Sequence, residues 1–118
     1  MNKRNVGSYY ENIAEEYLIN KGYVILNRNY RCRFGEIDII CRYDSYIVFV
    51  EVKYRSSLKY GEPVEAVTYT KQRKICRTAS YFIMNNKYGQ NVNYRFDIIG
   101  IMGNHSIIHY ENAFEYTV

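Results

Sequence analysis

The sequence predicts an α/β domain in which helices pack on a mixed β-sheet. The length of 118 residues suits one compact core. Two segments show apolar residues at helical spacing, and five segments are rich in β-branched and aromatic residues, in the order α-β-β-β-α-β-β. A strand, a helix and a strand in succession predict a right-handed parallel crossover. We therefore expect residues 1–118 to form a single domain.

The first helix is predicted over residues 6–21. Its apolar side chains recur at positions i, i+3, i+4, i+7 and i+8, which places them on one buried stripe, and Gly22 provides a stop. These side chains are Tyr10, Ile13, Ala14, Tyr17 and Leu18.

Three strands follow, over residues 23–30, 36–42 and 46–54. A turn at 31–35 separates the first two, and polar turn residues at 43–45 precede the third. We expect these strands to form an antiparallel meander. The third strand, YIVFVEVKY, has the highest density of apolar residues, which favours a central position in the sheet.

The second half of the chain begins with a basic loop at 55–62. The second helix is predicted over 68–87, because apolar side chains recur at helical spacing and Gly89 follows. Strands at about 92–102 and 105–110 complete the chain.

Composition excludes several classes of protein. Hydrophobic residues at 47% and charged residues at 24% exclude a disordered chain. No apolar run is long enough for a transmembrane helix, and the N-terminal segment becomes acidic where a signal peptide would be apolar. The three cysteines show no CxxC spacing, which argues against a disulfide framework and a structural zinc site. We therefore expect a cytoplasmic protein without a membrane partner.

Tyrosine is unusually frequent, with 15 residues against no tryptophan. A tyrosine ring suits half-buried surfaces and stacking against bases, and it also favours strands. The tyrosine content alone does not distinguish these uses.

The charge is unevenly distributed. Residues 1–95 contain 16 basic and 9 acidic side chains, although the net charge of the chain is only +4. Seven of the basic side chains lie between positions 53 and 77, where such a cluster would attract polyanions in a salt-sensitive way. They are Lys53, Arg55, Lys59, Lys71, Arg73, Lys74 and Arg77. A solvated helix face and loop is the alternative interpretation.

Acidic residues also occur inside two strands that are otherwise apolar. The segment GEIDII places Glu36 and Asp38 in the second strand, and FVEVK places Glu51 and Lys53 in the third. Charges inside an apolar strand are costly unless they are paired or coordinate a metal. These residues are therefore candidates for a functional site.

The strand period places Glu51 and Lys53 on one face of the third strand, and Val50 and Val52 on the other. Asp38 lies on the neighbouring strand, where the short turn can bring it opposite Glu51. Two carboxylates on adjacent strands suit Mg²⁺ or Mn²⁺, which prefer oxygen ligands. The lysine could then hold or polarise the water that attacks a phosphodiester.

The alternative interpretation is structural. Glu51 and Lys53 would form an ion pair near the end of the strand, and Asp38 would cap a turn.

Asp38 followed by Glu51-Val52-Lys53 resembles the D…E-x-K signature of the PD-(D/E)XK nuclease superfamily, whose fold is restriction endonuclease-like. Further segments extend the match, and together they resemble the YraN-like family. These small bacterial proteins are predicted nucleases related to archaeal-type Holliday junction resolvases. The matching segments are GSYYE at 7–11, NYR at 29–31, GEIDII at 35–40, FVEVKYR at 49–55, Gly61, KQ at 71–72 and RFD at 95–97.

The resemblance implies roles for individual residues. Asp38 and Glu51 would be metal ligands together with the backbone carbonyl of Val52, and Lys53 would be the catalytic lysine. Glu11, on the inner face of the first helix, matches a resolvase-type glutamate that supplements the metal site. A solvent-exposed helix residue is the alternative for Glu11.

The resemblance also implies contacts with nucleic acid. Arg55, Lys71 and Gln72 would contact phosphate or support the active centre. Surface solvation is an equally good interpretation of other basic residues in the region, namely Lys59, Arg73, Lys74 and Arg77.

Four further polar residues, Glu36, Asp97, His105 and His109, are not part of the predicted metal site. Glu36 has the strand parity of Asp38, so it either approaches the site or lies at the exposed start of the strand. Asp97, in the segment RFD, is expected to have a structural role. His105 and His109 lie in a predicted hairpin, and their spacing has no supporting context for a metal site.

The leading functional hypothesis is a Mg²⁺-dependent DNA endonuclease acting on branched, junction or damaged DNA. The resemblance implies in-line attack by water that leaves 5′-phosphate and 3′-hydroxyl ends. A domain of this size has little surface for reading a long sequence, so DNA structure is the expected target. A homodimer would grip two strands symmetrically.

Two alternatives stay open. One is a non-catalytic nucleic-acid-binding module, whose metal-independent binding would be insensitive to Glu51→Ala. The other is a subunit that binds metal but cleaves only with a protein partner in DNA processing.

Overall fold

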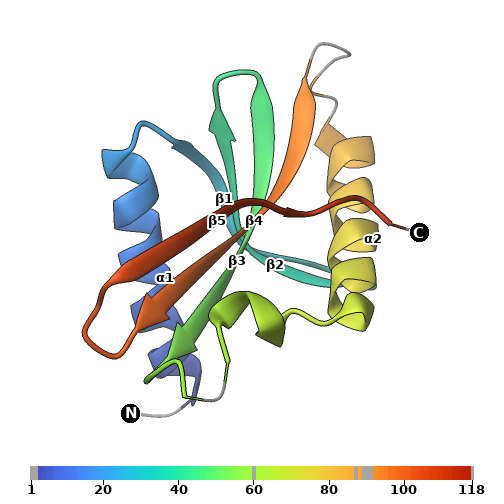
Figure 1. Cartoon of the computed structure of the whole chain (residues 1–118). Coiled ribbons are helices and arrows are strands. Elements are labelled where there is room, and N and C mark those ends of the chain that lie inside the picture. Colours follow the sequence, from blue (N-terminus) through green and yellow to red (C-terminus); the bar gives the residue numbers. More distant parts are fainter. Residues whose placement is uncertain (1–2, 60, 87, 89–91, 118) are drawn as a thin grey trace.

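The computed structural model describes residues 3–59, 61–86, 88 and 92–117, with side chains from residue 7 onward. Five strands form one mixed sheet that is flanked by two helices (Figure 1), which is compatible with the predicted restriction endonuclease-like core. The elements in chain order are α1 (Lys3–Asn20), β1 (Val24–Cys32), β2 (Gly35–Tyr43), β3 (Tyr46–Arg55), the 3₁₀ helix η1 (Pro63–Ala66), α2 (Tyr69–Asn86), β4 (Asn93–Met102) and β5 (Ile107–Phe114).

The sheet has the spatial order β1-β2-β3-β4-β5. The first three strands form an antiparallel meander, β4 runs parallel to β3, and β5 returns antiparallel to β4. The predicted order of elements, the parallel crossover through α2 and the central position of the third strand are therefore confirmed.

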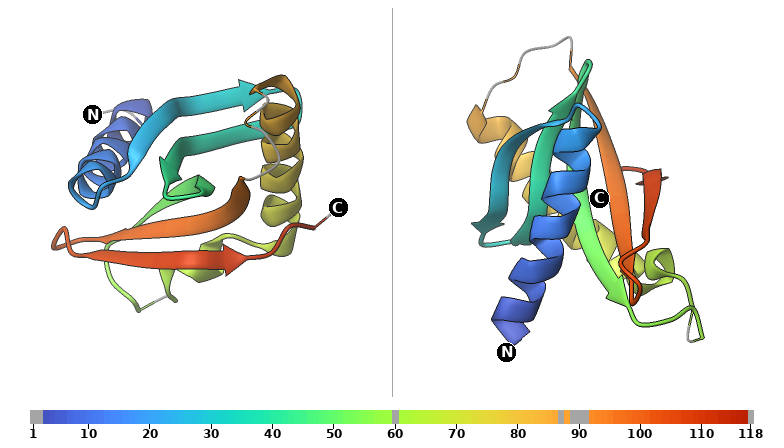
Figure 2. Two further views of the ribbon diagram at one scale, coloured as in Figure 1. Left: turned by 90° about the horizontal axis from the view of Figure 1, so that it is seen from above. Right: turned by 90° about the vertical axis from the view of Figure 1, so that its left-hand side faces the viewer.

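The two helices cover opposite faces of the sheet (Figure 2). Val48 and Val50 of β3 belong to the apolar core that contains Leu18 of α1, whereas Ile47 and Phe49 belong to the core that contains residues of α2. Because both faces are covered, the first half of β3, residues 46–50, is apolar at every position, and charged residues alternate with apolar ones only from Glu51 onward.

The last strand is longer than the predicted segment 105–110. The ladder between β4 and β5 is irregular at Asp97, and Asn112 opposite it adopts a left-handed φ of 52°. The Asn112 N–H donates a hydrogen bond to the Asp97 carboxylate at 2.9 Å. This bulge lets β5 continue through polar residues that the strand pattern does not include.

Other differences lie at the turns. The turn predicted at 31–35 narrows to residues 33 and 34, because β1 and β2 extend on either side of it. The second helix ends at Asn86, and position 87 and the expected stop at Gly89 lie outside the described residues. The short helix η1 was not predicted from the sequence.

Two expectations from composition concern membranes and cysteines. Neither helix within the described ranges is long and apolar enough to cross a lipid bilayer. All three cysteines are free thiols, with Cys41 and Cys76 buried and Cys32 half-buried.

Candidate functional site

Strands β2 and β3 stop pairing at the positions of their acidic residues. The antiparallel ladder between β2 and β3 reaches Ile39 opposite Val50. The next pair would be Asp38 and Glu51, but the Asp38 carboxylate instead accepts a hydrogen bond from the backbone N–H of Val52 at 2.8 Å. The side chain of Asp38 therefore links the two strands beyond the point where their backbones pair.

β2 changes its packing at the same point. Strand alternation would place Ile37 and Ile39 on one face. Ile37 instead belongs to the core that contains α2, and Ile39 to the core that contains α1. On the neighbouring strand, Asn29 adopts a left-handed φ of 53°. Asp38 therefore lies between the two apolar cores and belongs to neither.

A pocket of about 350 Å³ opens where the strands separate. It brings together the N-terminal half of α1, the beginning of β2 and the C-terminal end of β3. Figure 1 shows this half of α1 beside the end of β3. The pocket is lined by Gly7, Tyr10, Glu11, Glu36, Asp38, Glu51, Val52, Lys53 and Tyr54.

The pocket holds an excess of negative charge. Burial raises the pKa of Asp38 to about 6, and the charge of Glu11 adds to this rise. Burial also raises the pKa of Glu51 to about 8, with the charge of Asp38 acting in the same direction. Lys53 opposes both shifts, and its Nζ lies 3.9 Å from Glu51 Oε2. The pocket therefore favours a bound proton or an additional cation.

Glu11 faces the pocket from α1, with only 15% of its side chain exposed. It is therefore not the solvent-exposed helix residue of the alternative interpretation. Its Oε1 lies 3.3 Å from Arg28 of β1, which also pairs with Glu15 at 2.7 Å. The role of Arg28 could not be predicted from its neighbours in the sequence. Its two partners, Glu11 and Glu15, lie on α1, the element before β1.

Two of the carboxylates that line the pocket are suited to bind a divalent cation. Mg²⁺ is commonly bound by one or two carboxylates and completes its shell with water and substrate phosphate. Asp38 and Glu51 match this pattern. Within the ranges that the structure describes, no three His, Cys, Asp or Glu side chains converge closely enough to hold a metal ion. Glu11 pairs with Arg28 instead of completing a group of three carboxylates.

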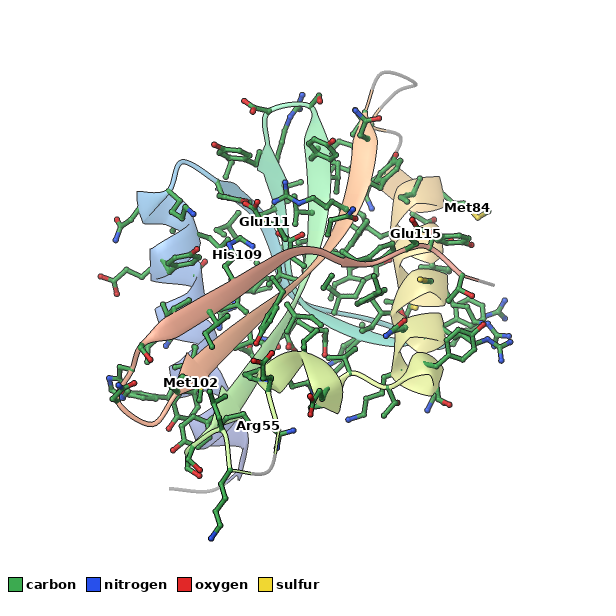
Figure 3. The ribbon with its side chains drawn as sticks, in the orientation of Figure 1. Arg55, Met84, Met102, His109, Glu111 and Glu115 are labelled. Atoms are coloured by element: carbon green, nitrogen blue, oxygen red, sulfur yellow. The ribbon has the colours of Figure 1, made fainter. Side chains whose placement is uncertain are left out.

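The predicted contacts with nucleic acid lie outside the pocket lining. Arg55 lies at the end of β3 beside Met102 of β4 (Figure 3). Lys71 Nζ donates to the carbonyl of Ala66 at 3.4 Å, and Gln72 Nε2 donates to that of Val67 at 3.1 Å. Lys71 and Gln72 thus hold the segment between η1 and α2.

The remaining basic candidates are Lys59, Arg73 and Lys74. Lys59 is exposed in the loop after β3. Arg73 and Lys74 line a small pocket on α2 of about 130 Å³, together with Thr70 and Arg77. A Cβ built on Gly35 would lie 3.9 Å from Lys74 Cβ, so this face of α2 lies next to the turn that leads into the acidic segment of β2.

The comparison with known proteins agrees with the resemblance in sequence. The model of the uncharacterised protein family UPF0102, the YraN family, matches residues 10–101. The chain belongs to this family. The match spans Glu11, the acidic segments of both strands and the whole Arg95–Asp97 segment.

Relatives in the UPF0102 family match nearly the whole chain. A protein of Caldicellulosiruptor saccharolyticus is 51% identical over 104 residues, which cover 88% of this chain and 87% of the relative. One from Lachnoclostridium phytofermentans is 47% identical over 115 residues, covering 98% and 97%. One from Clostridium botulinum (strain Loch Maree / Type A3) is 44% identical over 117 residues, covering 95% of each chain. Each is named only as a UPF0102 protein.

In this UPF0102 chain, Asp97 lies outside the acidic pocket and is buried in a separate network. It accepts hydrogen bonds from Arg95 Nε and Nη2, each at 2.9 Å, and from the Asn112 N–H. His109 Nε2 lies 2.7 Å from its Oδ2, and Tyr17 of α1 bonds to the other ring nitrogen at 3.0 Å. Figure 3 shows His109 on β5. The network joins α1, β4 and β5, as a structural role requires.

The environment of Asp97 differs from that of the acidic pair. Burial alone would raise its pKa, but the hydrogen bonds from His109, Arg95 and the Asn112 N–H outweigh burial and lower the pKa of Asp97. Asp97 is therefore ionised and fully hydrogen-bonded in the folded chain. Asp38 and Glu51 have too little positive charge around them to offset their burial, so their pKa values rise instead.

An aromatic group at the mouth of the pocket was not predicted. The rings of Tyr10 and Tyr54 are stacked with centroids 4.3 Å apart, and Tyr9 packs edge-on to Tyr10 at 5.1 Å. The tyrosine content is high and the segments GSYYE and FVEVKYR contain these rings, but neither signal predicts that they pair. Tyr54 lies more than forty positions from its ring partner in the sequence, so the pairing becomes visible only in the fold.

Proposed function

We propose that this chain is a DNA endonuclease that depends on Mg²⁺ or Mn²⁺ and hydrolyses phosphodiester bonds in branched or junction DNA. The observation that supports the proposal most strongly is the convergence of Asp38, Glu51 and Lys53 in one pocket. The hydrogen bond from the Val52 N–H to Asp38 fixes the relation between the two strands that supply them.

A phosphodiester substrate needs a bound cation in order to enter this acidic pocket. Four acidic side chains line it, on Glu11, Glu36, Asp38 and Glu51. Glu11 is paired with Arg28 and Glu36 with Arg31, which leaves Lys53 as the cation that acts on Asp38 and Glu51. A phosphodiester anion would be repelled from this surface unless further positive charge were bound. Asp38 and Glu51 would hold the ion, with the Val52 carbonyl as the implied third ligand. When bound, the ion stabilises the negative charge that develops on the phosphate.

Lys53 supports the reaction through its ammonium group. Its Nζ shares the pocket with the carboxylates, where it can hold the attacking water and donate to a phosphate oxygen. A preorganised donor of this kind stabilises developing charge without reorganisation. Glu11, held by Arg28 on the opposite wall, would position water or the ion rather than receive the substrate.

Binding of the DNA backbone would use the basic residues beyond the pocket. Arg55, Lys59, Lys71, Gln72, Arg73 and Lys74 are the candidates from the sequence. Because the five cationic side chains among them would act mainly by neutralising phosphates, and the neutral Gln72 would only donate a hydrogen bond, the binding should weaken strongly with salt.

The test is cleavage of a labelled panel of single-stranded, duplex, flap and four-way junction DNA in Mg²⁺, Mn²⁺ or EDTA. The wild type should cleave only with metal, and Lys53→Ala should lower the rate by about 100-fold or more. Lys21→Ala is a matched control, because Lys21 lies in the turn that follows α1, where its Nζ contacts the Tyr17 hydroxyl at 3.3 Å, and it does not line the acidic pocket. Cleavage in EDTA, or an unchanged rate in Lys53→Ala, would refute the proposal.

A non-catalytic nucleic-acid-binding module is the second candidate. It is favoured by the basic side chains of Arg73, Lys74 and Arg77, which line a small pocket on α2 and would bind phosphate without a metal. Salt-sensitive binding without cleavage, unaffected by Glu51→Ala, would support this candidate. Metal binding without cleavage would instead support a subunit that needs a protein partner.

Size-exclusion chromatography with and without junction DNA would test the expected homodimer.

A further inference from the structure

We propose that Tyr54 and Tyr10 form a stacking platform for an unpaired nucleobase at the mouth of the acidic pocket. The inference rests on the proposed function and specifies its substrate. The strand that enters the pocket would carry an unstacked base next to the scissile phosphate, as at a flap, a junction or a single-stranded end.

The two rings of the platform and the two rings that support them come from three separate parts of the fold. Tyr54 of β3 stacks on Tyr10 of α1 with an interplanar angle of 23°. Tyr9 meets Tyr10 edge-on at 84°, and the ring of His105, in the turn before β5, lies 5.8 Å from that of Tyr9. The Tyr9 hydroxyl and His105 Nε2 are 3.3 Å apart. The contacts hold the outer rings in defined positions.

The platform is open to solvent. Tyr54 is 42% exposed and Tyr9 is 41% exposed, although both rings take part in aromatic contacts. Tyr10 stacks on one face of the Tyr54 ring, while Tyr54 as a residue stays exposed. Exposed aromatic surface of this kind, beside a polar pocket, is suited to an incoming planar group.

The position of the platform identifies that group. Tyr54 directly follows Lys53, and both residues line the acidic pocket together with Tyr10. The two side chains leave β3 on opposite faces, but both border the pocket, so a nucleotide whose phosphate binds near Lys53 would have the Tyr54 ring within the same pocket for its base. Stacking requires no positive charge from the protein, so it can hold a strand close to carboxylates that would otherwise repel it.

The platform also restricts the substrate. In a duplex, each base already stacks on its neighbours, and a protein ring gains access only to a base that has left the stack. Stacking accepts any base, because every base has a π-face. The expected preference is therefore for unpaired structure and not for a sequence.

The test measures binding separately from cleavage, by fluorescence anisotropy in EDTA and in Ca²⁺. The probes are a labelled single-stranded oligodeoxythymidine, an abasic strand with the same number of phosphates, and a duplex. The variants are Tyr54→Leu and Tyr54→Met, where methionine keeps a similar bulk without the ring in case leucine disturbs the packing on Tyr10. Tyr54→Phe keeps the ring. Tyr116→Leu is the control, because Tyr116 is 56% exposed and lies against Ser80 of α2.

The wild type should bind oligodeoxythymidine more tightly than the abasic strand. Loss of one stacked base should raise the Kd for oligodeoxythymidine by about 5- to 150-fold in Tyr54→Leu and Tyr54→Met. Their Kd for the abasic strand should stay within about twofold, since the phosphate contacts are unchanged. Tyr54→Phe should restore the difference between the two strands, and Tyr116→Leu should retain it.

Three outcomes would overturn the platform. They are equal wild-type binding of the thymidine and abasic strands, an equal loss of both in the Tyr54 variants, and no binding of any probe. Cleavage by the wild type in Mg²⁺ reports on the proposed function independently. Cleavage without a base effect would refute the platform alone, whereas a base effect without metal-dependent cleavage would refute the nuclease alone.

Discussion

The carboxylate of Asp38 takes the backbone N–H of Val52 as its hydrogen-bond partner, at 2.8 Å. Val52 stands between Glu51 and Lys53, so this single contact positions the strand segment that supplies both charged side chains to the pocket. The bond forms where the β2–β3 ladder ends, which is why the strands can separate there without leaving this N–H unpaired.

This contact predicts a stability difference between two neutral variants of Asp38. Asparagine can still accept a bond from the Val52 N–H, whereas alanine cannot. Asp38→Ala should therefore be less stable than Asp38→Asn by about 0.5–1.5 kcal/mol, the net contribution of one half-buried hydrogen bond. Urea unfolding of both variants at one pH measures the difference. Equal stabilities would show that the bond does not hold the strands.

The raised pKa of Glu51 predicts a dependence of stability on pH. The folded chain keeps this proton until about pH 8, whereas the ordinary pKa is 4.5, so the folded state binds more protons than the unfolded state between these values. Stability should therefore fall as the pH rises from about 5 to 8. The pKa of Asp38, raised to about 6, adds to this fall at the lower end of the range.

Glu51→Gln should be more stable than the wild type at the upper end of this range and should show a flatter profile. Urea unfolding across the range measures the slope. Glu16→Gln, at an exposed position of α1, is the control and should keep the wild-type slope. The pH prediction fails if Glu51→Gln and the wild type lose stability in parallel.

Metal binding should be detectable without any substrate. An ion that binds only the folded state stabilises it, by about 1.4 kcal/mol at ten times its Kd. Mg²⁺ should therefore raise the melting temperature of the wild type by several degrees, and that of Glu51→Gln much less. Lys53→Ala should keep or increase the shift, because it removes a positive charge beside the carboxylates. An identical shift in wild type and Glu51→Gln would place the ion elsewhere.

The buried network around Asp97 should be essential for stability. Asp97→Asn leaves Arg95, which is only 12% exposed, without its carboxylate partner. Breaking one side of a buried ion pair typically costs about 3–5 kcal/mol. Glu111→Gln is the matched control, since Glu111 is 55% exposed and lies 3.9 Å from Arg95, and its effect should stay within about 0.5 kcal/mol.

The lowered pKa of Asp97 fixes the sign of its pH effect. Its contribution should be fully present above the ordinary pKa of 3.8 and should be lost as the pH falls through the lower folded pKa. The stability difference between the wild type and Asp97→Asn should therefore shrink in acid, as measured by urea unfolding. A difference that grows in acid would contradict this assignment.

Gly100 should tolerate no side chain. A Cβ at this position would lie 2.5 Å from Cγ of Pro63, where η1 packs on β4. Gly100→Ala should therefore destabilise the fold by about 1–3 kcal/mol through overpacking. Gly7→Ala in α1 is the contrasting variant, because its Cβ would lie 3.9 Å from Glu11 Oε2, an ordinary contact distance. That variant should be neutral or more stable by up to about 1 kcal/mol.

The order of elements was predictable because hydrophobic periodicity is a local property. The apolar stripe of α1 and the continuous apolar run of β3 identify a helix and a central strand without knowledge of their partners. Element ends were less predictable. β5 continues past residue 110 because Asn112 adopts a left-handed conformation and bonds to Asp97, a contact between two strands.

The pocket residues were also recognisable locally, since a charge inside an apolar strand is costly and stands out from its neighbours. By itself, the sequence determined the α/β order and identified Asp38, Glu51 and Lys53 as candidates, and the resemblance to a known family added Glu11. The tertiary structure alone decided that Glu11 pairs with Arg28, that Asp38 binds the Val52 N–H, and that Tyr10 stacks on Tyr54. Such contacts join residues from different elements, and their geometry depends on how the helices and strands pack.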